Sequence, residues 1–183
     1  MMRRMEALAV AGMLLLIASS ALAIGTPAGT TITSQATANY QDANGNPLTA
    51  LSNIVTVTVS QVGAVSVGPD NAATVVPGEV HYYPHLVTNS GNGNDVIDVT
   101  AASANGWTVA LYLDVNGNGT YEAGTDTPLA DSDTDGTPDS GTLAADGTAR
   151  ILVAVSVPTS AADGLVETTT VTGRSSFDTG VAD

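Results

Sequence analysis

The sequence contains no cysteine and no lysine, and it has only four arginines, one tryptophan and one phenylalanine in 183 residues. Without cysteine there is no disulfide and no thiolate metal site, so any long loop must be stiffened by other means. The 18 acidic residues outweigh the four basic ones and give a formal net charge of -14. A surface this acidic argues against nucleic acid and anionic membranes as partners.

The motifs of common enzyme classes are also missing. The sequence has no Gly-x-Ser-x-Gly nucleophile elbow and no phosphate-binding glycine loop. Its only histidines, His81 and His85, share one face of an extended segment and could pair on a transition metal. No third soft ligand accompanies them, which favours a structural role. We therefore expect a protein that is not an enzyme.

The N-terminus is typical of a secretory signal peptide over residues 1–23. Two arginines precede the apolar stretch Ala7–Leu22, which closes with the small-x-small sequence Ala21-Leu22-Ala23. The apolar stretch is short for a membrane span, although a retained membrane helix is the competing interpretation. We expect a secreted protein at the cell surface that begins near Ile24 and has no membrane partner once the signal is removed.

Residues 24–60 predict a β-hairpin. Alternation with period two runs from Thr30 to Tyr40, and valine alternates with threonine from Ile54 to Val59. Between them lies the turn signal Ala43-Asn44-Gly45-Asn46-Pro47. A hairpin of two strands is only marginally stable in water, so this one needs a packing partner.

Residues 61–183 predict an all-β sandwich. Short strand-like segments follow one another, separated by turns rich in Asn, Gly and Pro, and no helical periodicity occurs beyond the signal segment. The expected strands include Thr74–Val76, Val80–Thr88, Val96–Ala101, Trp107–Leu113, Ile151–Val157 and Leu165–Thr172. Many short strands separated by turn residues are characteristic of a β-sandwich.

An acidic, glycine-rich loop spans residues 114–141 in two runs. Oxygen-bearing side chains recur at every second position and a glycine breaks each run, which is the ligand spacing that suits Ca²⁺. The first run offers Asp114, Asn116, Asn118, the Thr120 carbonyl, Glu122 and Asp126, and the second offers Asp131, Asp133, Asp135, the Thr137 carbonyl and Asp139. The loop has no Lys or Arg to offset its carboxylates, so one to three bound Ca²⁺ ions explain the pattern better than a solvated loop without an ion.

Residues Pro69–Thr172 resemble the immunoglobulin-like conserved repeat domain of bacterial and archaeal cell-surface proteins. The resemblance lies in Pro77-Gly78, in Tyr82-Tyr83-Pro84-His85-Leu86-Val87-Thr88-Asn89, in Gly106-Trp107-Thr108-Val109 and in the acidic loop. The hairpin, with Ala36-Thr37-Ala38-Asn39-Tyr40 and Ser52-Asn53-Ile54-Val55, resembles the last two strands of another copy.

The two acidic runs resemble different calcium loops. The first run is similar to an EF-hand loop, but Thr125 stands where the EF-hand has glutamate at position 12. The second run resembles the aspartate-rich loops of thrombospondin type 3 repeats. Both resemblances imply Ca²⁺ as the ligand.

The resemblance to the repeat domain also implies a missing element. Members of that family end in a Thr/Val-rich strand like Ile54–Val59, whereas this sequence reaches Phe177–Asp183 where that strand should begin. The expectation is an immunoglobulin-like β-sandwich that lacks its last strand and is preceded by an N-terminal donor hairpin.

An open sheet edge of this kind is a template for pairing with another strand. We expect Thr30–Tyr40 or Ile54–Val59 of one molecule to complete the next by strand addition, in a head-to-tail homopolymer that forms an extracellular filament or surface fibre stiffened by calcium. Two alternatives stay open: a hairpin that folds back on its own domain, and a monomeric calcium-dependent adhesin or glycan-binding module.

Overall fold

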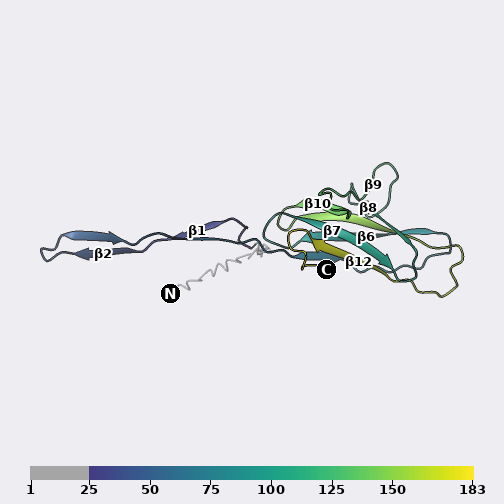
Figure 1. The fold of residues 1–183 in the computed structure, drawn as a ribbon, viewed down its shortest axis with the longest axis horizontal. Helices are drawn as coiled ribbons and strands as arrows, with labels where there is room; N and C mark the ends of the chain where they lie inside the picture. The colour runs from purple at the N-terminus through teal and green to yellow at the C-terminus, as the bar shows by residue number, and fades with distance from the viewer. Residues whose placement is uncertain (1–24) are drawn as a thin grey trace, which may run out of the picture.

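A long two-stranded arm projects from one end of a β-sandwich (Figure 1). The computed structural model describes residues 25–183, so the predicted signal peptide lies outside the described residues. The described part holds twelve strands and no helix, in agreement with the all-β prediction. None of its elements is a helix long and apolar enough to cross a membrane.

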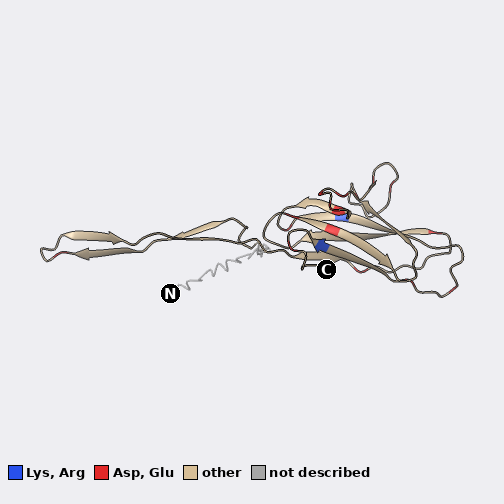
Figure 2. Cartoon of the chain, viewed as in Figure 1, with Lys and Arg blue, Asp and Glu red and all other residues tan. Residues whose placement is uncertain are grey.

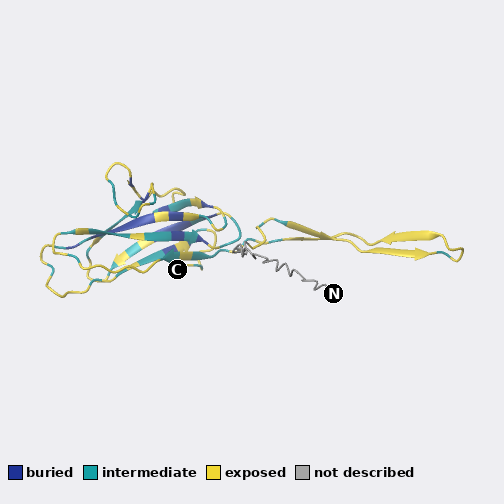
Figure 3. Cartoon of the chain, turned by 180° about the vertical axis from the view of Figure 1, so that it is seen from behind, coloured by how far each residue is buried: buried dark blue, intermediate teal, exposed yellow. Residues whose placement is uncertain are grey.

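The arm, residues 30–59, is called the ribbon below. Its outgoing strand consists of β1 (Thr31–Ser34) and β2 (Thr37–Gln41), and its return strand of β3 (Pro47–Leu51) and β4 (Val55–Thr58). β1 pairs with β4 and β2 with β3, all antiparallel. A hairpin therefore forms, but its return strand begins at Pro47 and not at Ile54 as predicted. Every residue of these four strands is exposed (Figure 3).

One side chain holds both legs of the ribbon at its base. Asn92 Nδ2 donates to the carbonyls of Thr26 and Ser60, and Asn92 Oδ1 accepts from the Val62 amide at 2.7 Å. The Ala28 amide donates to the Asn92 carbonyl at 2.8 Å. The ribbon therefore leaves the sandwich at the turn between β6 and β7, which we call the near end.

The sandwich consists of a five-stranded and a three-stranded sheet. Its strands are β5 (Val65–Gly68), β6 (Val80–Asn89), β7 (Asp95–Ser103), β8 (Thr108–Leu113), β9 (Thr127–Pro128), β10 (Asp139–Leu143), β11 (Thr148–Ser156) and β12 (Thr169–Ser175). The five-stranded sheet has the order β5-β6-β11-β8-β9, and the three-stranded sheet has the order β10-β7-β12. Every neighbouring pair is antiparallel.

The predicted strands form, with two corrections. Thr74–Val76 is not a strand: residues 69–76 pair with no strand of the described chain, and Val76 is 64% exposed. The segment predicted as Leu165–Thr172 pairs only from Thr169 onward. Both unpaired segments lie at the end of the sandwich opposite the ribbon, which we call the far end.

The core lies between the two sheets and is almost entirely aliphatic. It is built from Val87 of β6, Ile97 and Val99 of β7, and Ile151 and Val153 of β11, each at most 1% exposed. Alternation along β11 places Ile151, Val153 and the following Val155 on the inner face, as the sequence predicted. Dense packing of branched side chains is the main source of stability in such a core.

The two sheets meet tightly at one corner of the near end. A Cβ at Gly173 of β12 would lie 2.7 Å from Cγ2 of Val67 in β5, so only glycine allows this approach. The segment Val181–Asp183 pairs with β12 through Gly173 and Ser175, and Asp183 Oδ2 accepts the Val67 amide at 2.7 Å. These contacts close the near end.

Candidate functional site

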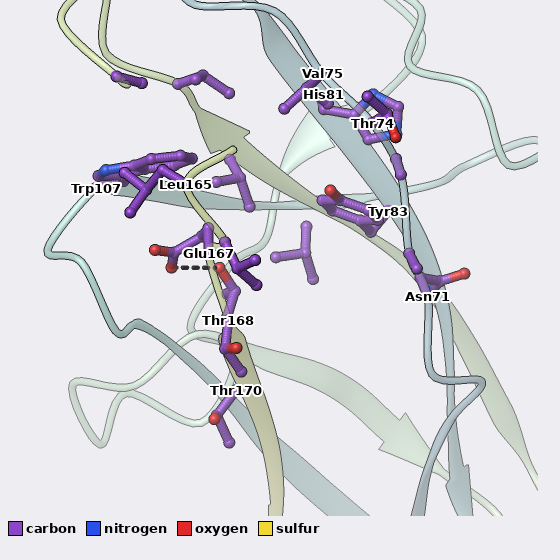
Figure 4. Close-up of a pocket in the computed structure, with 18 of the residues that line it drawn as sticks. Asn71, Thr74, Val75, His81, Tyr83, Trp107, Leu165, Glu167, Thr168 and Thr170 are labelled. Carbon is purple, nitrogen blue, oxygen red and sulfur yellow. Dashed lines mark hydrogen bonds between the residues drawn. The ribbon is translucent and has the colours of Figure 1, made fainter. Parts of the chain in front are cut away.

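A groove opens between the two sheets toward the far end (Figure 4). Its volume is about 1080 Å³. Alternate residues of β6 (His81, Tyr83 and His85) and of β11 (Val153 and Val155) line it, and these belong to the inner face of the five-stranded sheet. The unpaired segments 69–77 and 161–168 form its walls, and Trp107 also lines it.

The groove lies beside the outer edge of β12. Gly173 and Ser175 direct their backbone groups away from β7 and bond to Val181–Asp183. By the alternation of an antiparallel ladder, Thr169 and Val171 direct theirs to the same side. Within residues 25–183 no strand pairs with that stretch of the edge. The lining of the groove thus includes a segment of unpaired backbone.

The groove holds both histidines of the chain. Burial lowers the pKa of His85, whose Nδ1 is buried with no hydrogen-bond partner in the described structure. His81 Nδ1 lies 3.3 Å from Glu79 Oε1, and its ring meets Tyr83 edge-on with the ring centroids 4.6 Å apart. The histidines share one face, as predicted, but no third metal-binding side chain joins them in the described part of the chain.

Glu167 fixes the wall of the groove where β12 begins. Its carboxylate accepts the Asn105 amide at 3.1 Å and the Thr169 hydroxyl at 3.3 Å. Burial raises the pKa of Glu167, but hydrogen bonds from Ser103, Asn105 and Thr169 outweigh it, so the pKa is lowered overall. The side chain therefore adds a negative charge to a groove that Asp70 and Asp163 also line.

The acidic loop lies outside the groove, and its first run folds around buried carboxylates. Asp114, which is 6% exposed, accepts the amides of Gly117, Asn118 and Gly119 at 2.7, 3.2 and 2.8 Å. Asp126, 5% exposed, accepts the amides of Val115 and Glu122 at 3.1 and 2.7 Å. These bonds wrap the backbone around the two aspartates.

The remaining predicted ligands of the first run also bond to one another. Glu122 accepts the side-chain amides of Asn116 and Asn118 at 2.9 and 2.6 Å. Asn118 Oδ1 in turn accepts the Thr120 amide at 2.8 Å. The structure brings the six residues of this run into one hydrogen-bonded loop, although their carboxylates do not gather as a group of three.

The second run brings carboxylates together more closely. Oxygen atoms of Asp131, Asp133 and Asp139 lie within 4.8 Å of one another, and those of Asp98, Asp133 and Asp135 do so as well. Such a cluster could hold a metal ion. Thr137, the other predicted ligand, donates its amide to Asp135 at 2.7 Å.

Asp98 was not predicted from the sequence. It belongs to β7 and stands directly opposite Asp139 in the ladder with β10, so the sheet itself adds a carboxylate to the cluster. The available signal was a single aspartate between Ile97 and Val99 in an apolar strand. A charge at such a position is costly unless something pairs with it.

The second run is strongly negative, as expected from its composition (Figure 2). Burial, followed by the charges of Asp135, Asp133 and Asp139, raises the pKa of Asp98. Arg174 faces Asp98 across the ladder but donates to the Thr179 carbonyl at 3.3 Å. The pKa of Asp139 is raised by burial but lowered overall by hydrogen bonds from Ser132 and Gly141. Of these two buried aspartates, Asp98 is therefore the one whose ionised form is disfavoured.

Comparison with known proteins assigns the chain to no family. No protein-family model matches the chain, and no curated protein matches it either. The resemblance to the immunoglobulin-like repeat domain therefore stays a prediction. Three features of the molecule itself bear on its function: an exposed ribbon at one end, a groove toward the other, and a cluster of aspartates that could bind a cation.

Proposed function

We propose that this protein is a secreted structural subunit that polymerises head to tail into an extracellular filament. Each molecule places its ribbon in the groove of the next, and Ca²⁺ bound at the acidic loop stiffens each unit. The observation that carries the proposal is the placement of an unpacked ribbon and an open groove at opposite ends of one molecule.

The ribbon has an apolar face against which no other part of residues 25–183 packs. The cross-strand pair Ile32–Val57 is 51% and 57% exposed, and the pair Tyr40–Leu48 is 52% and 41% exposed. Full burial of such a side chain contributes about 1.5–3 kcal/mol. Packing this face would therefore provide the free energy that a two-stranded ribbon lacks on its own.

The ribbon of one molecule cannot fill the groove of the same molecule without reversing direction. It is held by Asn92 at the near end and points away from the sandwich (Figure 1). The groove lies toward the other end of β6, a strand of 10 residues that spans about 33 Å. Because donor and acceptor surfaces differ, the contact repeats in one direction and builds an open chain.

Calcium supports the filament by stiffening the loop. The second run offers carboxylates and the Thr137 carbonyl, and hard cations with 6–8 oxygen ligands such as Ca²⁺ suit this all-oxygen donor set. An ion that binds the folded loop but not the unfolded chain stabilises the fold by mass action. Asp98 supports this role, because it would tie the loop to the three-stranded sheet through the ion.

The alternative of glycan binding would use the calcium loop or exposed aromatic rings. Sugars stack on free aromatic faces, and the strongest candidate is the cluster of Tyr82, Tyr112 and Tyr121. Tyr82 and Tyr121 stack on each other with centroids 4.5 Å apart and planes 2° apart. Tyr112 meets Tyr121 edge-on at 4.9 Å. Each of the two stacked rings therefore has one face occupied by the other.

Negative-stain microscopy and sedimentation of the exported protein, with Ca²⁺ and with chelator, test the proposal. We expect filaments that sediment in calcium, and fewer or more flexible filaments in chelator. Monomers under both conditions at concentrations up to about 1 mM would contradict the polymerisation, because a subunit of a stable fibre associates far below that level.

A further inference from the structure

We propose that both strands of the ribbon enter the groove, with the return strand next to β12 and the outgoing strand beyond it. Along Thr169–Val171, the part of the β12 edge that Val181–Asp183 leaves unpaired, the inserted ribbon would extend the three-stranded sheet to five strands, in the order β10-β7-β12-return-outgoing. The inference rests on the proposed function and specifies which segment of the second copy pairs with which edge.

The uncovered inner face of the five-stranded sheet in the groove is two strands wide. β12 lies over β5 at the near end, where Gly173 meets Val67, but β5 ends at Gly68 and leaves the far-end half of β6 without a strand at its edge. The groove is lined by inner-face residues of β6 and β11, which are hydrogen-bonded neighbours. Neighbouring strands lie about 4.8 Å apart, so a single inserted strand would cover only half of this width. The two-stranded ribbon matches it.

The direction of the strands decides which one lies beside β12. β12 runs from the far end toward the near end, since Thr169 follows the far-end loop and Ser175 packs near Gly63. A ribbon that enters from the far end, tip first, has a return strand that runs the opposite way. Pairing of the return strand with β12 is therefore antiparallel, like every other pair in the sandwich, whereas the outgoing strand would pair in parallel.

The ribbon keeps one apolar face along its whole length, as insertion requires. Ser34 pairs with Val55, but Thr37 pairs with Leu51, so the return strand has one extra residue between its two halves. This bulge compensates for the change in alternation between β3 and β4. By alternation, one face holds the apolar residues Ile32, Ala38, Tyr40, Leu48, Ala50, Val55 and Val57. The opposite face is threonine-rich, although it also carries Leu51, which pairs with Thr37 and is 64% exposed.

The polar atoms of the groove fit the same arrangement. In the proposed order the outgoing strand lies over β6, where the buried His85 Nδ1 has no hydrogen-bond partner in the described residues. The outgoing strand carries the hydroxyls of Ser34 and Tyr40 on the face that would meet the groove. The return strand would place aliphatic residues over Val153 and Val155 of β11.

Engineered cysteines test this order directly, because the natural chain has none. Thr170 of β12 is on the outer face and takes one cysteine. The second cysteine is placed on the threonine-rich face of the return strand in T49C, T56C or T58C. The matched controls carry it at the cross-strand partners on the outgoing strand, in N39C, T33C or T31C.

We expect a ladder of disulfide-linked oligomers from T170C combined with at least one return-strand cysteine, after mild oxidation of the polymer. The outgoing-strand controls should stay monomeric in denaturing gels, since their Cα atoms lie about 10 Å from β12 and disulfides need less than about 7 Å. The inference would be overturned if, in sedimenting polymers, only the outgoing-strand cysteines cross-link, if both sets cross-link, or if neither set does. Each of these outcomes would leave the proposed function intact. Absence of polymers from the unsubstituted protein would overturn both.

Discussion

The ribbon and β11 are made of the same kinds of residue in the same conformation, yet the side chains of the ribbon are exposed and those of β11 are buried. Val55 and Val57 of the ribbon are 56% and 57% exposed, while Val153 and Val155 of β11 are 1% and 3% exposed. The difference lies in what faces each strand: β11 has a second sheet in front of it, and the ribbon has none. Alternation alone therefore predicts a strand but not its packing partner.

This comparison also separates two sources of stability. The sandwich holds a core of its own, closed at the near end by Gly173 and Val67. The ribbon is stabilised by its ladder, its turn at Asp42 and its anchor at Asn92, without a core. The account therefore predicts that substitutions in the two regions affect different measurements.

The largest effect is expected from charges on the apolar face of the ribbon. Val55→Asp with Val57→Asp should weaken association at least about 100-fold, because an unpaired buried carboxylate costs several kcal/mol. The melting temperature of the monomer should not change. Thr56→Asp with Thr58→Asp, on the opposite face, is the matched control and should still polymerise in sedimentation assays. Equal loss in both variants would mean that the face does not matter.

The next largest effect concerns the second acidic run. Changing Asp131, Asp133 and Asp135 to Ala should remove the stabilisation by Ca²⁺, about 3 kcal/mol at 100-fold excess over the dissociation constant. For a domain of this size each kcal/mol shifts the melting temperature by about 2–4 °C. Calorimetry with Ca²⁺ and with chelator measures the change. If the melting temperature of the variant responds to chelator as strongly as that of the natural protein, Ca²⁺ does not bind at the second run.

Truncation of matched valines compares the two regions directly. Val153→Ala should lower the free energy of unfolding of the monomer by about 2 kcal/mol through lost burial and a cavity. Val57→Ala should change it by less than about 0.5 kcal/mol, since the side chain is exposed. In the polymer, Val57→Ala should instead weaken association measurably. Denaturant titration measures the free energy of unfolding, and sedimentation measures the association. If Val57→Ala lowers the free energy of unfolding of the monomer as much as Val153→Ala does, the hairpin is folded on its own domain.

The smallest effect is expected at Asp98. Because its pKa is raised in the folded state, the ionised carboxylate destabilises the fold above that pKa, and protonation relieves the penalty as the pH falls through it. Asp98→Asn should therefore raise the melting temperature in chelator at neutral pH, and the advantage should shrink on acidification. Addition of Ca²⁺ should raise the melting temperature of the variant less than that of the natural protein. Asp163→Asn, in an exposed loop, is the control and should show neither change.

The sequence predicted the elements better than their arrangement. The turn residues at 43–47 and the alternation in Thr30–Tyr40 and Ile54–Val59 sufficed to predict a hairpin, because both signals are local, but β3 was not predicted. Thr74–Val76, which was predicted as a short strand before the Pro77-Gly78 turn, formed none, since strand formation depends on a neighbouring edge that local sequence does not specify. The aspartates of the second run were predicted from their spacing, whereas Asp98 joined them through a β7–β10 register that only the fold provides.

A high-resolution map of the assembled filament tests the central claim most directly. The account predicts that residues 30–59 of one molecule occupy the groove of its neighbour, with the return strand beside Thr169 and Val171. A filament in which the groove is filled by the same chain, or left open while other surfaces make the contact, would contradict it.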